Sequence, residues 1–152
     1  MRYVPTTTGK EQSGPAALKA AADDAVIIIR QKKPLDRELT PVEYGNIYAE
    51  HIHKPSEDGL GPYFRLIYTI LKRIDSDKEL TPEEKVQYGN LLRGQLGSPE
   101  VALISLNGLT KASKDLSMYL RRYRVPKYIA ISSIRAKIPE WYGADVLEDR
   151  PD

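Results

Sequence analysis

The 152 residues suffice for one compact domain, and the 41% apolar and 29% charged fractions are ordinary for a globular protein, which excludes extensive disorder. The 23 Lys and Arg residues against 21 Asp and Glu residues leave a net charge of only +2, and the absence of cysteine excludes disulfides, thiolate metal sites and cysteine nucleophiles. No apolar run reaches the about 20 residues that a membrane helix needs, and residues 1–10 lack a secretory signal, so we expect a cytoplasmic protein.

Residues 1–14 are polar and have no hydrophobic period, so we expect them to form a flexible lead. Helical periodicity begins at Ala16. From there one helical stripe collects the apolar residues Leu18, Ala21, Ala25, Ile28 and Ile29. The β-branched run at residues 26–29 leaves a strand as the alternative.

Two strong helix-start signals follow. Thr40, Pro41 and Glu43 can form a capping box, which predicts a helix from Pro41 to about His53. Thr81, Pro82 and Glu84 repeat the arrangement, and the helix that they open should end near Gly97. Its expected inner face consists of Tyr88, Leu91, Leu92, Gln95 and Leu96.

Between these two helices, Pro55, Gly59 and Gly61 predict a break, and Pro62 should then open a central helix. Its expected inner stripe contains Phe64, Ile67, Tyr68, Leu71 and Ile74.

Ser98 and Pro99 start the next predicted helix, and residues 101–106 are apolar on all sides. We expect a short, fully buried helix with a left-handed end at Asn107 and Gly108, with a buried strand as the alternative.

Residues 111–123 indicate a basic helix that Pro126 interrupts, with a short helical piece near residues 128–134. Residues 139–152 should form an irregular acidic tail. The chain is therefore predicted to be an all-α, compact orthogonal bundle of about five to seven helices, with a single helical domain over residues 15–138.

Three segments in the middle half of the chain carry a specific pattern. They read GPYFRLIYTILKRID at residues 61–75, YGNLLRGQLGSPE at residues 88–100 and ISLNGL at residues 104–109. Together they resemble the phage abortive infection family of AbiC-like bacterial proteins. The resemblance implies a role in protecting bacteria from phage, without implying a particular biochemical activity.

The helix ends in this region hold several polar residues that could form a structural corner or contact a partner: Arg65, Arg93, Gln95, Glu100 and Asn107. We expect Arg93 and Glu100 to form an ion pair across the corner between their helices. Asn107 is interpreted as a helix terminus.

The sequence offers no recognisable catalytic group, cofactor motif or metal site. The two histidines, His51 and His53, point to different faces of one helix, and neither follows an arginine at the spacing used by small helical ribonucleases. The aromatic group of Tyr63, Phe64 and Tyr68 fits core packing better than a recognition pocket.

One basic cluster could bind nucleic acid. It contains Arg121, Arg122, Arg124 and Lys127, interleaved with Tyr119, Tyr123 and Tyr128. The alternative is a solvated face, or one that pairs with the acidic tail at residues 140–149. We therefore predict a defence domain that binds a protein partner or a second copy of itself, with a nucleic-acid-binding effector or ribonuclease-like toxin as the alternative.

Overall fold

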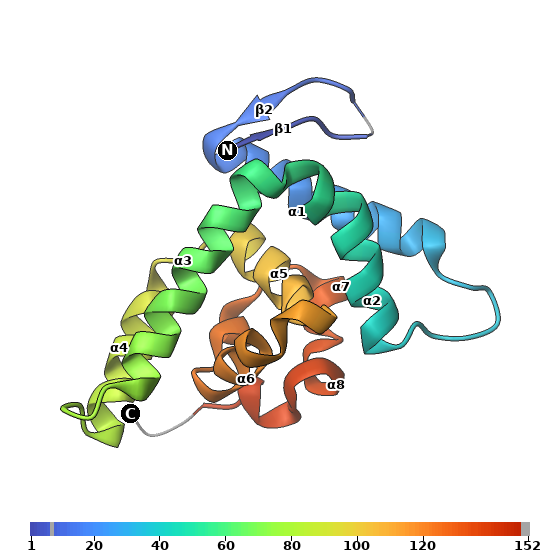
Figure 1. The fold of residues 1–152 in the computed structure, drawn as a ribbon. Coiled ribbons are helices and arrows are strands. Elements are labelled where there is room, and N and C mark those ends of the chain that lie inside the picture. The colour runs from blue at the N-terminus through green and yellow to red at the C-terminus, as the bar shows by residue number, and fades with distance from the viewer. Residues whose placement is uncertain (7, 150–152) are drawn as a thin grey trace.

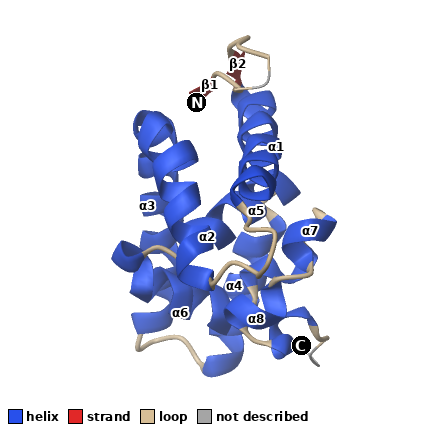
Figure 2. Ribbon diagram, turned by 90° about the vertical axis from the view of Figure 1, so that its right-hand side faces the viewer, coloured by secondary structure: helices blue, strands red, loops and turns tan. Residues whose placement is uncertain are grey.

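The computed structural model describes residues 1–6 and 8–149, and most of them lie in helices (Figures 1 and 2). The longer helices are α1 (Gly14–Lys32), α2 (Pro41–Tyr48), α3 (Glu57–Ser76), α4 (Pro82–Gly94), α5 (Ser98–Asn107) and α6 (Lys114–Arg122). Two short helices follow, α7 (Ser132–Arg135) and α8 (Ile138–Tyr142). The long helices cross one another within a single compact body, which confirms the predicted all-α class.

The first thirteen residues carry more structure than the polar sequence predicts. Strand β1 (Arg2–Tyr3) pairs antiparallel with β2 (Gln12–Ser13) at the start of α1. The Tyr3 hydroxyl donates a hydrogen bond to Oδ2 of the buried Asp24, 2.7 Å away, and the Thr6 amide donates to the same oxygen at 2.9 Å. The segment is thus fixed to α1 by a buried carboxylate that its own composition does not reveal. Thr7 lies outside the described residues.

Helix α1 extends through residues 26–29, so the strand alternative for that run is wrong. Helix α2 begins as predicted, because Thr40 Oγ1 accepts from the Glu43 amide while the Glu43 carboxylate accepts from the Thr40 amide. Hydrogen bonds from Arg37 and from the Thr40 amide lower the pKa of Glu43 to about 2.

The predicted break before Pro62 is wrong. After α2 the chain stays helical through a π-helical turn (Ala49–His53) and a 3-10 turn (Lys54–Ser56), and Pro62 lies inside α3. A proline normally crowds the Cβ of the residue before it in helical backbone. Gly61 has no Cβ, which relieves that crowding and lets the helix continue.

Helix α5 occupies the middle of the molecule, below α1 and above α6 and α8 in Figure 1. Every residue from Val101 to Asn107 is buried, which confirms the fully buried helix and rules out the buried strand. The left-handed end is wrong, because Gly108 has a φ of −63°. Glycine is needed there for space: an added Cβ would lie 2.8 Å from Cδ1 of Leu120.

The predicted inner face of α4 is wrong in part, because Leu92 and Leu96 pack against the core as expected but Tyr88, Leu91 and Gln95 do not. Tyr88 is 48% exposed and Leu91 is 63% exposed, whereas Gly89 and Arg93 are buried. Gly89 lies against the ring of Tyr123, so the inward position is filled by an aromatic side chain from outside the helix. Periodicity alone does not reveal this arrangement.

The tail is more regular than expected. Helix α8 is followed by a 3-10 turn (Ala144–Leu147), and both Tyr142 and Val146 are buried. The Tyr142 hydroxyl donates to the Ser105 carbonyl in the middle of α5. Residues 139–147 therefore complete the core, and residues 150–152 lie outside the described part of the chain.

Candidate functional site

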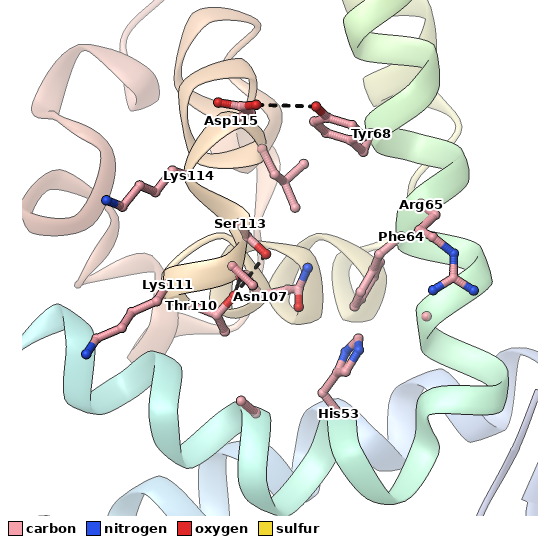
Figure 3. A pocket seen from close by; sticks show the side chains of 14 residues that line it. His53, Phe64, Arg65, Tyr68, Asn107, Thr110, Lys111, Ser113, Lys114 and Asp115 are labelled. Carbon is pink, nitrogen blue, oxygen red and sulfur yellow. Dashed lines mark hydrogen bonds between the residues drawn. The ribbon is translucent and has the colours of Figure 1, made fainter.

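A pocket of about 710 Å³ opens where three parts of the chain meet (Figure 3). One wall comes from the π-helical turn and α3, and the other from the C-terminal end of α5, the 3-10 turn Lys111–Ser113 and the start of α6. The lining residues are Ala49, His53, Gly61, Phe64, Arg65, Tyr68, Asn107, Thr110, Lys111, Ala112, Ser113, Lys114, Asp115 and Leu116.

Asn107 lies at the base of this pocket. The residue is only 9% exposed, and its side-chain amide has no hydrogen-bond partner among the residues that the structure describes. Figure 3 shows the amide in the space between Thr110 and Phe64. The sequence identified Asn107 as a helix terminus, and the structure adds that its donor and acceptor groups face the pocket.

Aromatic rings form the wall opposite Asn107. Phe64 is 3% exposed, and its ring is nearly parallel to that of His53, with 6.1 Å between their centroids. The Tyr68 hydroxyl lies 3.5 Å from Oδ2 of Asp115 on the far side of the opening. Phe64 thus belongs to the core and also lines the pocket.

The polar groups around His53 are largely occupied. Its Nδ1 lies 3.1 Å from the Tyr48 hydroxyl, and its Nε2 lies 2.5 Å from Oε2 of Glu57, which also accepts from Arg65 at 3.2 Å through its other oxygen. Burial and the nearby Glu57 carboxylate raise the pKa of Tyr48 well above its usual range. These contacts hold His53 against the wall of the pocket. The position of His53 could not be predicted from the sequence, because a π-helical turn has no sequence signature.

The remaining polar groups lie closer to the opening. Thr110 Oγ1 is 2.8 Å from the Asn107 carbonyl oxygen and 2.9 Å from Ser113 Oγ. In Figure 3 the ammonium groups of Lys111 and Lys114 point away from Asn107. Charge is therefore concentrated at the rim, while the interior offers aromatic carbon and neutral hydrogen-bonding groups.

The predicted Arg93–Glu100 ion pair is not formed. Glu100 instead accepts from the Tyr63 hydroxyl at 3.0 Å and from the Gly97 amide at 2.9 Å, which caps α5. The Arg93 guanidinium lies over the ring of Tyr128, 4.9 Å from its centroid. The two side chains serve separate contacts, and Gln95 is exposed at the end of α4.

The basic cluster is mostly engaged within the chain. Arg122 Nη1 lies 2.6 Å from both carboxylate oxygens of Asp75, and Arg124 donates to the Glu148 carbonyl at 2.8 Å. The ammonium of the buried Lys127 lies 2.9 Å from Asp149. Two of these contacts reach the acidic tail, but only that of Lys127 with Asp149 is an ion pair, since Arg124 bonds a backbone carbonyl.

The interleaved tyrosines are likewise divided between the core and the surface. Tyr119 and Tyr123 are buried, and only Tyr128 is exposed, at 65%. An array of free stacking rings beside free cations, as a nucleic-acid surface would need, is not formed by residues 119–128.

Comparison with known proteins gives one match. Residues 55–134 match the sequence model of a family described as putative phage abortive infection protein. No curated protein and no solved structure matches the chain. Within residues 1–6 and 8–149, every helix is too short or too polar to span a bilayer, and no three His, Asp or Glu side chains gather as a metal site would require.

Proposed function

This chain belongs to the putative phage abortive infection protein family, and on that premise we propose that it acts in bacterial defence against phage by binding a protein partner through the outer face of α4. The observation that carries the proposal is the outward position of Tyr88 and Leu91. The family match supports the defence role, and the surface of α4 supports binding as the way it is carried out.

Tyr88 and Leu91 are three positions apart and therefore lie next to each other on the helix. They cannot turn inward, because Gly89 and Arg93 already fill the inner face of α4 against Tyr123 and Tyr128. An exposed tyrosine beside an exposed leucine offers the rigid aromatic and apolar contact area that is enriched at protein interfaces.

Leu91→Glu tests the proposal. The substitution places a charge in the centre of the face without touching the core, so stability should change by less than about 0.5 kcal/mol. Cells that carry the variant should lose protection in a phage-plating assay, while its thermal melt matches that of the unmodified protein. Leu35→Glu is the matched control, because Leu35 is fully exposed in the loop before α2.

Sedimentation velocity of the purified chain distinguishes the two kinds of partner. We expect a monomer that acquires a partner in infected cells, captured by crosslinking from a residue introduced next to Leu91. A dimer that Leu91→Glu dissociates would identify a second copy as the partner. Full protection by a folded Leu91→Glu variant would remove this face from the mechanism.

A further inference from the structure

We propose that the pocket at Asn107 binds a small molecule that carries a nucleobase, with the base lying between the Asn107 amide and the Phe64 wall. The pocket is formed by α3, α5 and the start of α6, so this inference does not depend on the outer face of α4.

The size and lining of the pocket suit a ligand of this kind. Its volume of about 710 Å³ is within the range of roughly 300–1,000 Å³ for small-molecule sites. Phe64, Tyr68 and Leu116 provide apolar walls, and a flat heteroaromatic ring gains stacking and dispersion energy against such walls.

Asn107 supplies the recognition. Its side chain carries one carbonyl acceptor and one amide donor side by side, and this pair matches the adjacent acceptor and donor on a base edge such as that of adenine. The amide atoms open onto the pocket and are not sealed in the core, so both are available to a ligand that satisfies them. The Thr110 and Ser113 hydroxyls already bond each other, and Thr110 also bonds the backbone carbonyl of Asn107. The side-chain amide of Asn107 therefore remains available to a ligand.

The charges at the rim determine which part of a nucleotide is recognised. Arg65 is bound to Glu57, Asp115 faces Tyr68, and both lysines point away from Asn107. The interior therefore holds no unpaired cation for a phosphate. A nucleoside and its monophosphate should bind with similar affinity, because the phosphate would remain in solvent at the opening, where Lys111 and Lys114 act on it only through screening water.

Calorimetric titration of the purified full chain with adenosine, AMP, UMP, inorganic phosphate and a short single-stranded RNA tests the proposal. We expect adenosine and AMP to bind within about threefold of each other and phosphate not to bind. Asn107→Leu should weaken adenosine binding at least about tenfold, since a two-bond base contact is lost. Asn46→Leu, the same change at an exposed position of α2, should leave it unchanged.

Asn107→Asp keeps the side-chain shape while removing the donor, and it should also weaken adenosine binding about tenfold or more. The new carboxylate lies in a largely buried position, so its cost to the fold is read from the melting curve, and binding is compared at a temperature where both proteins are folded. Binding of phosphate as tightly as AMP, binding of RNA but of no nucleoside, or equal adenosine affinity in Asn107→Leu would each overturn the proposal. So would the absence of any nucleoside or nucleotide binding at millimolar concentration.

Discussion

The hydroxyl of Tyr63 on α3 donates a hydrogen bond to Oε2 of Glu100 on α5, at 3.0 Å. The same oxygen accepts from the Gly97 amide at 2.9 Å, so one carboxylate caps α5 and attaches it to α3. Burial, with the nearby Glu100 charge, raises the pKa of Tyr63 above its ordinary value. This bridge takes the place of the expected pair between Arg93 and Glu100.

We expect Glu100→Ala to destabilise the fold by about 1–3 kcal/mol, because it removes a cap and leaves the Tyr63 hydroxyl without its acceptor. Tyr63→Phe should cost less, about 0.5–1.5 kcal/mol. Urea denaturation of both variants and of the double variant measures the coupling. The loss of unfolding free energy in the double variant should be smaller than the sum of the two single losses, by at least about 0.5 kcal/mol. Strictly additive losses would contradict the bridge.

The sequence predicts local features well and contacts between distant segments poorly. The capping box at Thr40 is encoded within four residues, and it forms as predicted. At Pro62 the local pattern misleads, because Gly61 and Pro62 are typical of a break but lie inside α3. The inward position of Arg93 depends on the ring of Tyr128, which lies far along the chain and which no local pattern reveals. The pocket is lined by residues that lie between positions 49 and 116 of the sequence. That the Asn107 amide faces a pocket beside Phe64 and Thr110 therefore could not be predicted from the residues around Asn107.

Two glycines sit where helices touch other parts of the chain. An added Cβ at Gly45 would lie 2.7 Å from the carbonyl oxygen of Leu109, and one at Gly89 would lie 2.5 Å from Cδ1 of Tyr123. Overpacking costs about 1–3 kcal/mol, which outweighs the up to about 1 kcal/mol that alanine gains in a helix. We expect Gly45→Ala and Gly89→Ala each to lower stability by about 1–2 kcal/mol in chemical denaturation.

Gly94→Ala is the matched control. An added Cβ at Gly94 meets no atom within 4 Å, so the same substitution should be neutral or stabilising by up to about 1 kcal/mol. If all three glycine variants behave alike, close packing at Gly45 and Gly89 is not what the fold requires.

The Asp75 carboxylate should make the free energy of unfolding fall at acid pH. Burial raises the pKa of Asp75, but hydrogen bonds from Arg122 and Tyr123 outweigh it, and the net pKa falls below the ordinary 3.8. The stabilisation is therefore complete above about pH 3.8 and is lost as the pH falls through the lower folded pKa. Asp75→Asn should cost about 1–3 kcal/mol at pH 7.

The difference in unfolding free energy between Asp75→Asn and the unmodified chain should shrink as urea titrations move from pH 7 to pH 3. Asp36→Asn, on an exposed loop, supplies the comparison and should show a small difference at every pH. A cost for Asp75→Asn that stays constant down to pH 3 would show that the Asp75 charge does not stabilise this junction.

The contact between Tyr3 and Asp24 should hold the N-terminal strands in place. Asp24→Ala removes the acceptor of both the Tyr3 hydroxyl and the Thr6 amide. The buried Tyr3 hydroxyl then has no acceptor, which costs about 1–3 kcal/mol, whereas Thr6 is exposed and its amide can bind water. We expect the variant to be less stable and to be cleaved faster by trypsin after Arg2 and Lys10. Asp23→Ala, one residue away on an exposed surface, should resemble the unmodified protein. Equal cleavage rates in the two variants would contradict the role of Asp24.

The basic cluster is expected to support the fold more than to bind nucleic acid. Arg122→Ala breaks the contact with Asp75 and should lower stability by about 1–2 kcal/mol, since half of the arginine side chain is exposed and solvent weakens the pair.

Fluorescence anisotropy with single-stranded RNA at 50 and 200 mM salt measures whether the basic cluster binds nucleic acid. Because Arg122, Arg124 and Lys127 already hold partners within the chain, we expect affinity no tighter than about 0.1 mM at the higher salt. Micromolar binding that falls steeply with salt, and that Arg121→Ala weakens without altering the melt, would make this face a nucleic-acid surface after all.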